Sequence, residues 1–296
     1  MKRELKIQLD IKKKKIHNIK KKYMNPKSIL QELIKKPLIK QRTPEWFKLR
    51  EDKLTASDLH DAIKNPLSLA KKKLKGITFN SSAIPALKWG TMFESVATQI
   101  YSHINNKKIH EFGLIINDDI QHFGASPDGI TEDGVMIEIK CPYSRKIIDG
   151  EIPEKYYYQI QGQLAVCNLK DCDYIECQFI SLKSKEDYIN LESELKTDDN
   201  YKHGIIAEIK IKNDYEYKYS TKNQELIENI EEMEIYKNQG YNLIYWKLNL
   251  INIQKVEFNK NKWDSEITPK INDFYDIYIK EKKLSNPINQ FIDDDD

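Results

Sequence analysis

The sequence contains few cysteines and no long apolar run. Four cysteines among 296 residues are too few for the disulfide framework of a small secreted domain. Charged residues make up 32% of the chain, and its apolar runs are too short for a transmembrane helix. The N-terminus is charged and has no apolar segment of the kind that secretory signals carry. We therefore expect an intracellular, non-secreted protein, in the cytoplasm of a cell or infected host or in a nucleus, with no membrane partner.

Motifs for several common cofactors are also lacking. No P-loop is present, so nothing in the sequence indicates an ATP-driven motor. Cys167, Cys172 and Cys177 are separated by four residues each, whereas zinc sites use shorter spacings and a fourth ligand. The six histidines show no paired spacing, and no iron–sulfur motif occurs. Zinc and iron–sulfur sites are therefore not expected.

The composition is typical of a globular protein, and both ends of the chain are rich in charged residues. Hydrophobic residues make up 40% and aromatic residues 10%, which excludes a wholly disordered chain. Lysines dominate residues 1–22 and aspartates end the chain, although the overall net charge is only +2. A basic arm can follow a phosphate backbone, or it can be a solvated extension without a partner. We predict a basic N-terminal extension at 1–40, a single domain at 41–285 that includes C-terminal helices, and an acidic tail at 286–296.

The spacing of apolar residues predicts a mixed fold. Thr43 and Pro44 form a helix start, and Thr55–Asp58 has the capping-box form of a second one. Alternating segments between turn residues predict strands. The order predicts one α/β (α+β) domain with a mixed central β-sheet flanked by helices. Helices are further expected at 28–35, 86–104, 153–168, 224–238 and 267–282, and strands at 109–117, 121–126, 135–140, 174–182 and 204–211.

Three charged residues are placed where they can meet. Asp128 precedes a turn. Nine residues separate it from Glu138, which lies with Lys140 in a strand whose other residues are apolar. Because alternate side chains of a strand share a face, Glu138 and Lys140 project together while Ile137 and Ile139 enter the core. A Glu-x-Lys pair is more often a surface charge pair, but a buried strand seldom carries two charges on one face without a use. The spacing therefore predicts a polar site at the sheet surface.

The residue types in this site suit metal-assisted phosphodiester hydrolysis. Asp128, Glu138 and the backbone carbonyl of Ile139 offer the hard oxygen ligands that Mg²⁺ prefers, and Mn²⁺ can substitute. Lys140 would orient or help deprotonate a metal-bound water and offset charge in the transition state. Glu94 lies at the edge of the apolar face of the 86–104 helix and is the candidate for a second metal position. That apolar face, expected in the core, consists of Trp89, Phe93, Val96, Ile100 and Ile104.

An ordered set of motifs carries a family resemblance. Over about residues 43–182 the chain resembles the PD-(D/E)XK nucleases, specifically the phage lambda-type exonucleases and the YqaJ-type viral recombinases. The resemblance implies a restriction-endonuclease-like core and a single lambda-exonuclease-like nuclease domain at 41–285. The matching blocks are Trp46-x-x-Leu49-Arg50, Leu54-Thr55-Ala56-Ser57, Ala86-Leu87-Lys88-Trp89-Gly90 with Glu94, Ser126-Pro127-Asp128-Gly129, Glu138-Ile139-Lys140-Cys141-Pro142 and Tyr156-x-x-Gln159-Ile160-Gln161.

The resemblance implies a role for each matching residue. Asp128 and Glu138 match the family's metal ligands, Lys140 its catalytic lysine and Glu94 the acid at its second metal position. Gln159 matches a helical glutamine beside the site, with Gln163 as our second choice because it shares the same helix face. Residues that match those holding a 5′-terminal phosphate are Arg50 and Ser57, with Ser126 as a further hydroxyl.

The sequence itself supports the phosphate residues in part. Arg50 offers a planar fork suited to phosphate, and Ser57 is expected in the first turn of a helix whose N–H groups attract anions. Arg50 could instead satisfy carbonyls at a helix end, and Ser57 could be an ordinary cap. The family's usual glycine two residues after the arginine is Asp52 here, so its carboxylate must point away from a phosphate pocket.

The resemblance implies a Mg²⁺-dependent exodeoxyribonuclease. Such an enzyme degrades 5′-phosphorylated ends of double-stranded DNA in the 5′-to-3′ direction and leaves 3′ single-stranded tails for recombination or repair. It also implies a homotrimer and a single-strand annealing protein as partner. The alternatives are an endonuclease or RecB-like nuclease of the same fold, and a catalytically inactive DNA-binding module.

Overall fold

The structure is a computed structural model of the chain, which describes residues 24–76, 84–193, 195, 199–212, 214–221 and 224–285. The basic residues at 1–22 and the acidic tail at 286–296 lie outside these described residues. None of the described helices is both long and apolar enough to cross a membrane.

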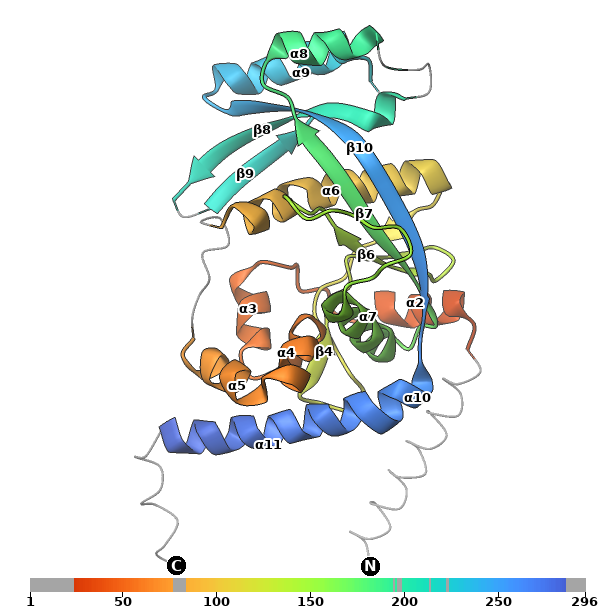
Figure 1. The fold of residues 1–296 in the computed structure, drawn as a ribbon, viewed down its shortest axis with the longest axis vertical. Coiled ribbons are helices and arrows are strands. Elements are labelled where there is room, and N and C mark those ends of the chain that lie inside the picture. Colours follow the sequence, from red (N-terminus) through yellow and green to blue (C-terminus); the bar gives the residue numbers. More distant parts are fainter. Residues whose placement is uncertain are drawn as a thin grey trace, which may run out of the picture.

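A mixed seven-stranded β-sheet forms the centre of the described part of the chain (Figure 1). Its strands lie in the order β2–β5–β6–β7–β10–β8–β9; β6 and β7 are parallel, and the other neighbours are antiparallel. A second, three-stranded sheet has the order β1–β4–β3. The strands are β1 Leu54–Thr55, β2 Ile109–His110, β3 Ile115–Ile116, β4 Phe123–Ala125, β5 Gly129–Thr131, β6 Met136–Lys140, β7 Asp171–Ser181, β8 His203–Ile211, β9 Asp214–Tyr219 and β10 Asn242–Glu257.

Helices cover both faces of the large sheet. In Figure 1, α8 and α9 lie above the end formed by β8 and β10, while α11 runs across the opposite end below α4 and α5. Three-residue to five-residue 3₁₀ or π turns lie at Ala56–Asp58, Asn190–Ser193, Asn200–Lys202 and Trp263–Ile267. The α-helices are α2 Pro26–Ile34, α3 Pro44–Arg50, α4 Leu59–Lys64, α5 Pro66–Leu74, α6 Pro85–Asn105, α7 Glu154–Cys167, α8 Lys185–Ile189, α9 Leu226–Asn238, α10 Lys260–Lys262 and α11 Thr268–Ser285.

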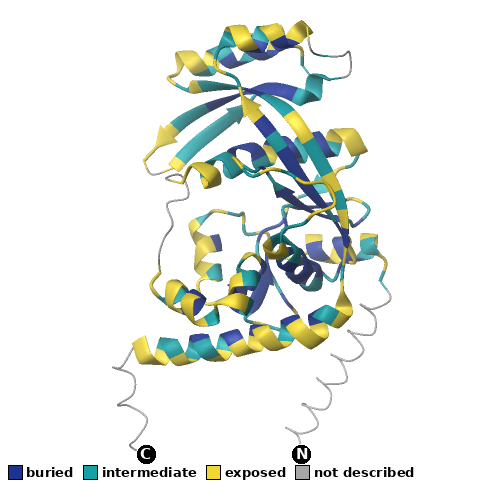
Figure 2. Cartoon of the chain, in the orientation of Figure 1, coloured by how far each residue is buried: buried dark blue, intermediate teal, exposed yellow. Residues whose placement is uncertain are grey.

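The two faces of β6 pack against different helices, as its alternation predicts. Ile137 and Ile139 point to α6, where they join a buried cluster with Phe93. Met136 points the other way and packs with Ile160 of α7. Figure 2 shows the buried residues concentrated at this centre, with exposed residues along the outer side of α11. The polar residues of β6 therefore lie on the α7 face, inside the molecule.

The fold class predicted from the sequence is confirmed, because the sheet is mixed and flanked by helices. Thr43 caps α3 as expected and accepts a hydrogen bond from the backbone of Trp46 at 3.3 Å. Ile104, which was expected in the core, is 39% exposed because it lies in the last turn of α6. Helices and strands that the sequence pattern did not predict are α5, α8, α10, β1, β5, β9 and β10.

Helix α2 belongs to the packed domain, although the predicted boundary lies at residue 40. Asn25 caps this helix and Pro26 occupies its first turn. Ile29, Leu30 and Leu33 are buried in the same cluster as β4 and α7. The many lysines around this segment favour a basic extension, and they outnumber the short apolar stripe that packs into the core.

Candidate active site

A tight turn places Asp128 beside β6. Asp128 directly precedes β5, and β5 pairs antiparallel with β6, so Gly129 lies opposite Ile137. The turn between the strands passes through Gly134, whose φ of +86° suits glycine. A side chain there would meet Pro26 at 2.5 Å. The result is a hydrogen bond in which the backbone N–H of Ile139 donates to Asp128 Oδ2 at 2.7 Å.

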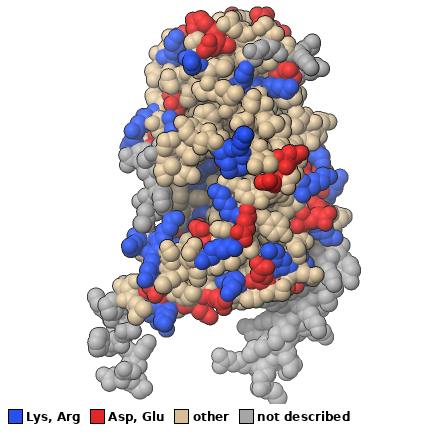
Figure 3. All heavy atoms as spheres, in the orientation of Figure 1, with Lys and Arg blue, Asp and Glu red and all other residues tan. Residues whose placement is uncertain are grey.

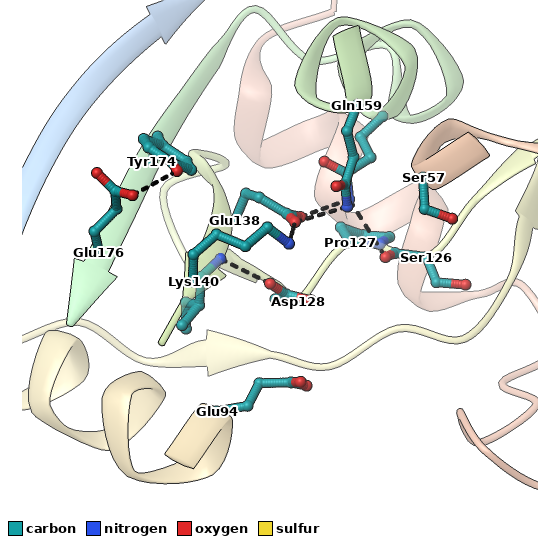
Figure 4. A network of polar contacts seen from close by, with 12 residues as sticks. Ser57, Glu94, Ser126, Pro127, Asp128, Glu138, Lys140, Gln159, Tyr174 and Glu176 are labelled. Atoms are coloured by element: carbon teal, nitrogen blue, oxygen red, sulfur yellow. Dashed lines mark hydrogen bonds and ion pairs between the residues drawn. The ribbon is translucent and has the colours of Figure 1, made fainter. Parts of the chain in front are cut away.

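Glu138 is the centre of a buried hydrogen-bond network (Figure 4). Its side chain is fully buried, with 0% exposure. Gln159 Nε2 donates to one carboxylate oxygen and Gln163 Nε2 to the other, each at 2.7 Å. Lys140 forms an ion pair with the oxygen that Gln159 contacts. The predicted shared face of Glu138 and Lys140 is therefore present, and both candidate glutamines of α7 reach the same carboxylate.

Helix geometry separates the glutamines of α7. Gln159 and Gln163 are one turn apart and face β6, whereas Gln161 points to the other side. There the Gln161 amide donates to the carbonyl of Glu257 and accepts from the N–H of Asn259. Gln161 therefore fixes the end of β10 and has no contact with Glu138.

Burial and neighbouring charges shift the pKa values of the central groups. Burial, followed by the negative charges of Glu138 and Glu94, raises the pKa of Asp128 well above its usual value. Burial lowers the pKa of Lys140, but Glu138 and Asp128 outweigh this effect and raise it. Lys140 is thus held as an ammonium. Its single positive charge does not balance the nearby carboxylates of Asp128, Glu138 and Glu94.

A second group of donors lies beside this network. Arg50 Nη2 donates to the hydroxyls of Thr55 at 3.1 Å and Ser57 at 3.2 Å, and its guanidinium stacks on Trp46 at 4.1 Å from the ring centroid. Trp46 Nε1 donates to Ser126 Oγ at 3.1 Å. Burial lowers the pKa of Arg50, with Asp58 opposing that effect. These contacts bring together the residues that the sequence predicted as a phosphate site.

The predicted capping box at Thr55–Asp58 is wrong. Residues 56–58 form a 3₁₀ turn, α4 begins only at Leu59, and neither Thr55 nor Asp58 caps with its side chain. The Thr55 hydroxyl instead donates to Asp58 Oδ2 at 3.0 Å. Side-chain groups, rather than a regular helix N-terminus, therefore provide the polar character around Ser57.

One pocket of about 150 Å³ joins both groups. On the face drawn in Figure 3, Lys and Arg side chains gather around the recess between the α3–α5 region and the β8–β9 region. Gln41 also reaches this pocket, where its amide donates to the carbonyls of Phe112 and Pro127. No sequence motif pointed to Gln41. The pocket is lined by Gln41, Trp46, Arg50, Thr55, Ala56, Ser57, Ser126, Asp128, Glu138, Lys140, Gln159 and Gln163.

Glu94 does not line this pocket. Arg42 Nη2 contacts its Oε2 at 2.7 Å, and the two side chains are 49% and 34% exposed. Within the described ranges, no three His, Cys, Asp or Glu side chains lie close enough together to hold a metal ion. Glu94 therefore does not form one cluster with Asp128 and Glu138, although its charge acts on Asp128, and its carboxylate pairs with Arg42 instead.

Asp52 points away from the phosphate residues, as the sequence required. Its carboxylate accepts hydrogen bonds from Tyr278 at 3.0 Å and Lys282 at 2.8 Å, both on α11. These two partners, Lys282 more strongly, lower the pKa of Asp52. The carboxylate that replaces the family's usual glycine thus ties α3 to α11.

A further buried acid lies next to Lys140 in the sheet. Glu176 of β7 is the register partner of Lys140 and is 0% exposed. Tyr174 donates to its Oε1 at 2.8 Å, and Arg145 forms an ion pair with the same oxygen. Glu176 and Tyr174 appear beside the site in Figure 4. The alternation of polar residues in the strand segment 174–182 was the available signal for this pair.

Comparison with known proteins finds a matching domain model, a similar viral protein and similar folds. Residues 45–170 match the YqaJ-like viral recombinase domain. Uncharacterized protein R354 of Acanthamoeba polyphaga mimivirus is 27% identical over 321 residues, a match that covers 91% of this chain and 58% of that protein's length. A crystal structure of an alkaline exonuclease from Laribacter hongkongensis has a TM-score of 0.51 at 20% identity, covering 84% of this chain and 99% of that one. A phage-related exonuclease from Haemophilus somnus 129PT aligns with a TM-score of 0.45 at 14% identity, covering 79% and 96%.

Proposed function

We propose that the chain is a nuclease that hydrolyses phosphodiester bonds of DNA, and the match of residues 45–170 to the YqaJ-like viral recombinase domain supports this proposal. The observation that carries this proposal is the single pocket in which Asp128, Glu138 and Lys140 adjoin Arg50 and Ser57. Carboxylates with a lysine suit phosphodiester hydrolysis, and an arginine with hydroxyls suits phosphate binding. One substrate strand could therefore contact both groups.

The donor chemistry of the pocket fits a divalent cation. Asp128 is buried among negative charges that raise its pKa, and a cation would relieve that repulsion. We propose Mg²⁺, with Mn²⁺ as a substitute, held by Asp128, Glu138 and the carbonyl of Ile139. Glu94 would become a further ligand of the cation only after its ion pair with Arg42 breaks. When bound, the cation would supply positive charge to the phosphoryl oxygens.

The chain's own residues supply the remaining chemistry. The ammonium of Lys140 would offset the charge that develops on the phosphate, or orient the attacking water. Gln159 and Gln163 would keep the Glu138 carboxylate in one orientation through their 2.7 Å contacts. Preorganised groups of this kind lower the barrier because they do not reorganise during the reaction.

The Arg50 side of the pocket favours an exonuclease. A site for a phosphate monoester anchors the end of a strand, so cleavage would start at a 5′-phosphorylated end of duplex DNA and proceed 5′ to 3′. The product would be a 3′ single-stranded tail for recombination or repair. A homotrimer and a single-strand annealing partner are implied by the family resemblance alone.

The deciding experiment is digestion of linear duplex DNA labelled separately at each strand end, with and without a 5′-phosphate, in Mg²⁺ or Mn²⁺. We expect release of nucleotides from 5′-phosphorylated strands and slower release from 5′-hydroxyl strands. Cleavage of covalently closed circles would instead favour the endonuclease alternative. Retarded migration of duplex DNA without nucleotide release would favour the inactive DNA-binding module.

A further inference from the structure

Lys73 is a largely buried lysine outside the pocket. It lies on α5, its side chain is only 15% exposed, and its Nζ is 3.6 Å from Asp58 Oδ2. Burial lowers the pKa of Lys73, Asp58 opposes this effect, and the positive charge of Arg50 adds to it. The ammonium of Lys73 is therefore close enough to Arg50 for the two cations to influence each other.

Asp58 connects these two cations. One of its oxygens accepts from the Thr55 hydroxyl at 3.0 Å and lies nearest Lys73. The same Thr55 hydroxyl accepts from Arg50 Nη2 at 3.1 Å. Lys73 therefore lies directly beside the Asp58 carboxylate, whereas Arg50 reaches it only through the Thr55 hydroxyl. These two cations and one carboxylate together carry one excess positive charge.

An excess positive charge has a chemical consequence for ligand choice. A terminal phosphate monoester carries about 1.5 to 2 negative charges at pH 7. An internal phosphodiester carries one, and a 5′-hydroxyl carries none. Because Asp58 interacts with two cations, it cannot neutralise both of them. The guanidinium of Arg50 therefore keeps part of its positive charge on the side that faces the pocket. A phosphate monoester therefore gains more binding free energy from this positive charge than a phosphodiester or a hydroxyl does.

We propose that Lys73 is a specificity-determining positioning residue, which shares Asp58 with Arg50 and so keeps the Arg50 guanidinium available to a 5′-terminal phosphate. This inference rests on the proposed nuclease function and deepens it. Lys73 does not touch the substrate in this arrangement, since it does not line the pocket. Its effect passes through Asp58, so it alters the preference for a terminal phosphate rather than the hydrolytic step.

The test compares Lys73→Gln with Lys71→Gln, which removes the same charge from an exposed position of the same helix, 4.0 Å from Glu281. The readout is the ratio of kcat/KM for duplex with a 5′-phosphate to that for duplex with a 5′-hydroxyl. We expect Lys73→Gln to reduce this ratio on the order of tenfold, mainly through KM for the phosphorylated end. Lys73→Arg should restore it, and Lys71→Gln should leave it unchanged. An unchanged ratio in Lys73→Gln, or an equal loss in Lys71→Gln, overturns the inference.

Asp58→Asn gives an independent test if Lys73→Gln does not fold. Asparagine keeps an oxygen for the Thr55 hydroxyl but removes the charge that the cations share. The ratio should then equal or exceed that of the unaltered protein, and a loss of the phosphate preference contradicts the charge-sharing argument. Equilibrium binding of both duplexes in Ca²⁺ separates this inference from the proposed function. If the wild-type chain binds phosphorylated ends more tightly but releases no nucleotides, the proposed nuclease function is wrong. The role of Lys73 can then still be tested by comparing the binding of the two duplexes to Lys73→Gln.

Discussion

Lys140 and Glu138 show how a short sequence motif becomes a buried charge network. The strand's alternation places both side chains on one face, and α7 then covers that face with two glutamine amides. The ammonium offsets part of the negative charge, and the glutamines satisfy the carboxylate oxygens. A buried carboxylate would otherwise be costly. Each of these residues therefore has a structural role as well as its proposed role in the reaction.

Replacing Lys140 by alanine should separate chemistry from binding. We expect cleavage to fall by about 10²-fold or more, because the charge on the transition state loses its stabilising ammonium. DNA binding should persist, since Arg50 and Ser57 remain. Single-turnover cleavage and fluorescence anisotropy with a labelled duplex measure the two effects. A Lys140→Ala chain that cleaves at the wild-type rate would remove Lys140 from the mechanism.

Asp128 should make the metal-free protein less stable as the pH rises. Its pKa is raised in the folded state, so the folded chain binds more protons than the unfolded chain above the ordinary Asp pKa. The stability that this proton contributes is present at low pH and is lost as pH rises through the folded pKa. Asp128→Asn should therefore stabilise the metal-free protein at neutral pH, by roughly 1–3 kcal/mol. Urea unfolding in EDTA across a pH series measures this.

The same Asp128→Asn variant should respond less to metal. Mg²⁺ or Mn²⁺ should raise the Tm of the unaltered chain, because a ligand that binds only the folded state stabilises it. The variant should show a smaller rise and a lower cleavage rate. Equal metal-induced shifts in the two proteins would show that Asp128 is not a ligand.

At the scale of elements, the β5–β6 turn controls where Asp128 lies. Gly134 combines a φ of +86° with a close approach to Pro26 of α2, so the turn and the first described helix fit together. Gly240 offers a natural comparison, because its φ is +90° but nothing lies within 4 Å of an added Cβ. Both positions have a left-handed backbone, but only Gly134 lacks room for a side chain.

Gly134→Ala should cost more stability than Gly240→Ala. Both substitutions strain a left-handed backbone, at about 1 kcal/mol, and only Gly134→Ala adds a clash worth a further 1–3 kcal/mol. We expect a larger loss of unfolding free energy and, because the turn also sets the position of Asp128, a lower cleavage rate for Gly134→Ala. Urea denaturation with both variants checks the difference. Equal losses would mean that α2 moves aside without cost.

The link between α3 and α11 through Asp52 should be weak. Its carboxylate is 66% exposed, so screening by solvent limits the pair with Lys282 to about 1 kcal/mol or less. The lowered pKa means that this contribution is present at neutral pH and is lost as pH falls through the folded pKa. Asp52→Gly, which restores the family's usual residue, should lower stability slightly and leave the phosphate preference unchanged. A changed preference would show that Asp52 reaches the phosphate site.

At the scale of the whole molecule, α2 closes the core that surrounds the site. Its Ile29, Leu30 and Leu33 are buried with residues of β4, α4 and α7. A chain that begins at residue 41 loses these side chains, whereas a chain that begins at residue 24 keeps them. We expect the shorter chain to be less stable by roughly 4.5–9 kcal/mol, at about 1.5–3 kcal/mol for each of the three buried side chains. Thermal unfolding of the two truncated chains measures this difference. Similar Tm values would support the domain boundary predicted at residue 40.

Much of the local structure could be predicted because its causes are local. The helix at Pro85–Asn105 was predicted within one residue at each end, since its apolar spacing extends over about four turns. The strand β10 was missed, although it is central to the sheet. Its sixteen residues mix polar and apolar side chains without a consistent alternation, and its ladder with β7 contains an irregularity between Leu248 and Leu250. Pairing with two neighbours, rather than its own pattern, makes this segment a strand.

By itself, the sequence determined most of the groups in the pocket, with the exception of Gln41, and which of them share a strand face or a helix face. The alternation of Glu138 with Ile139, and the one-turn spacing of Gln159 and Gln163, follow from backbone geometry alone. Only the tertiary structure decided which distant groups meet: Glu94 with Arg42, Asp52 with α11, Trp46 with Ser126 and Lys73 with Asp58. These contacts depend on how whole elements pack. Packing is set by many small contributions spread over the chain, which no local pattern records.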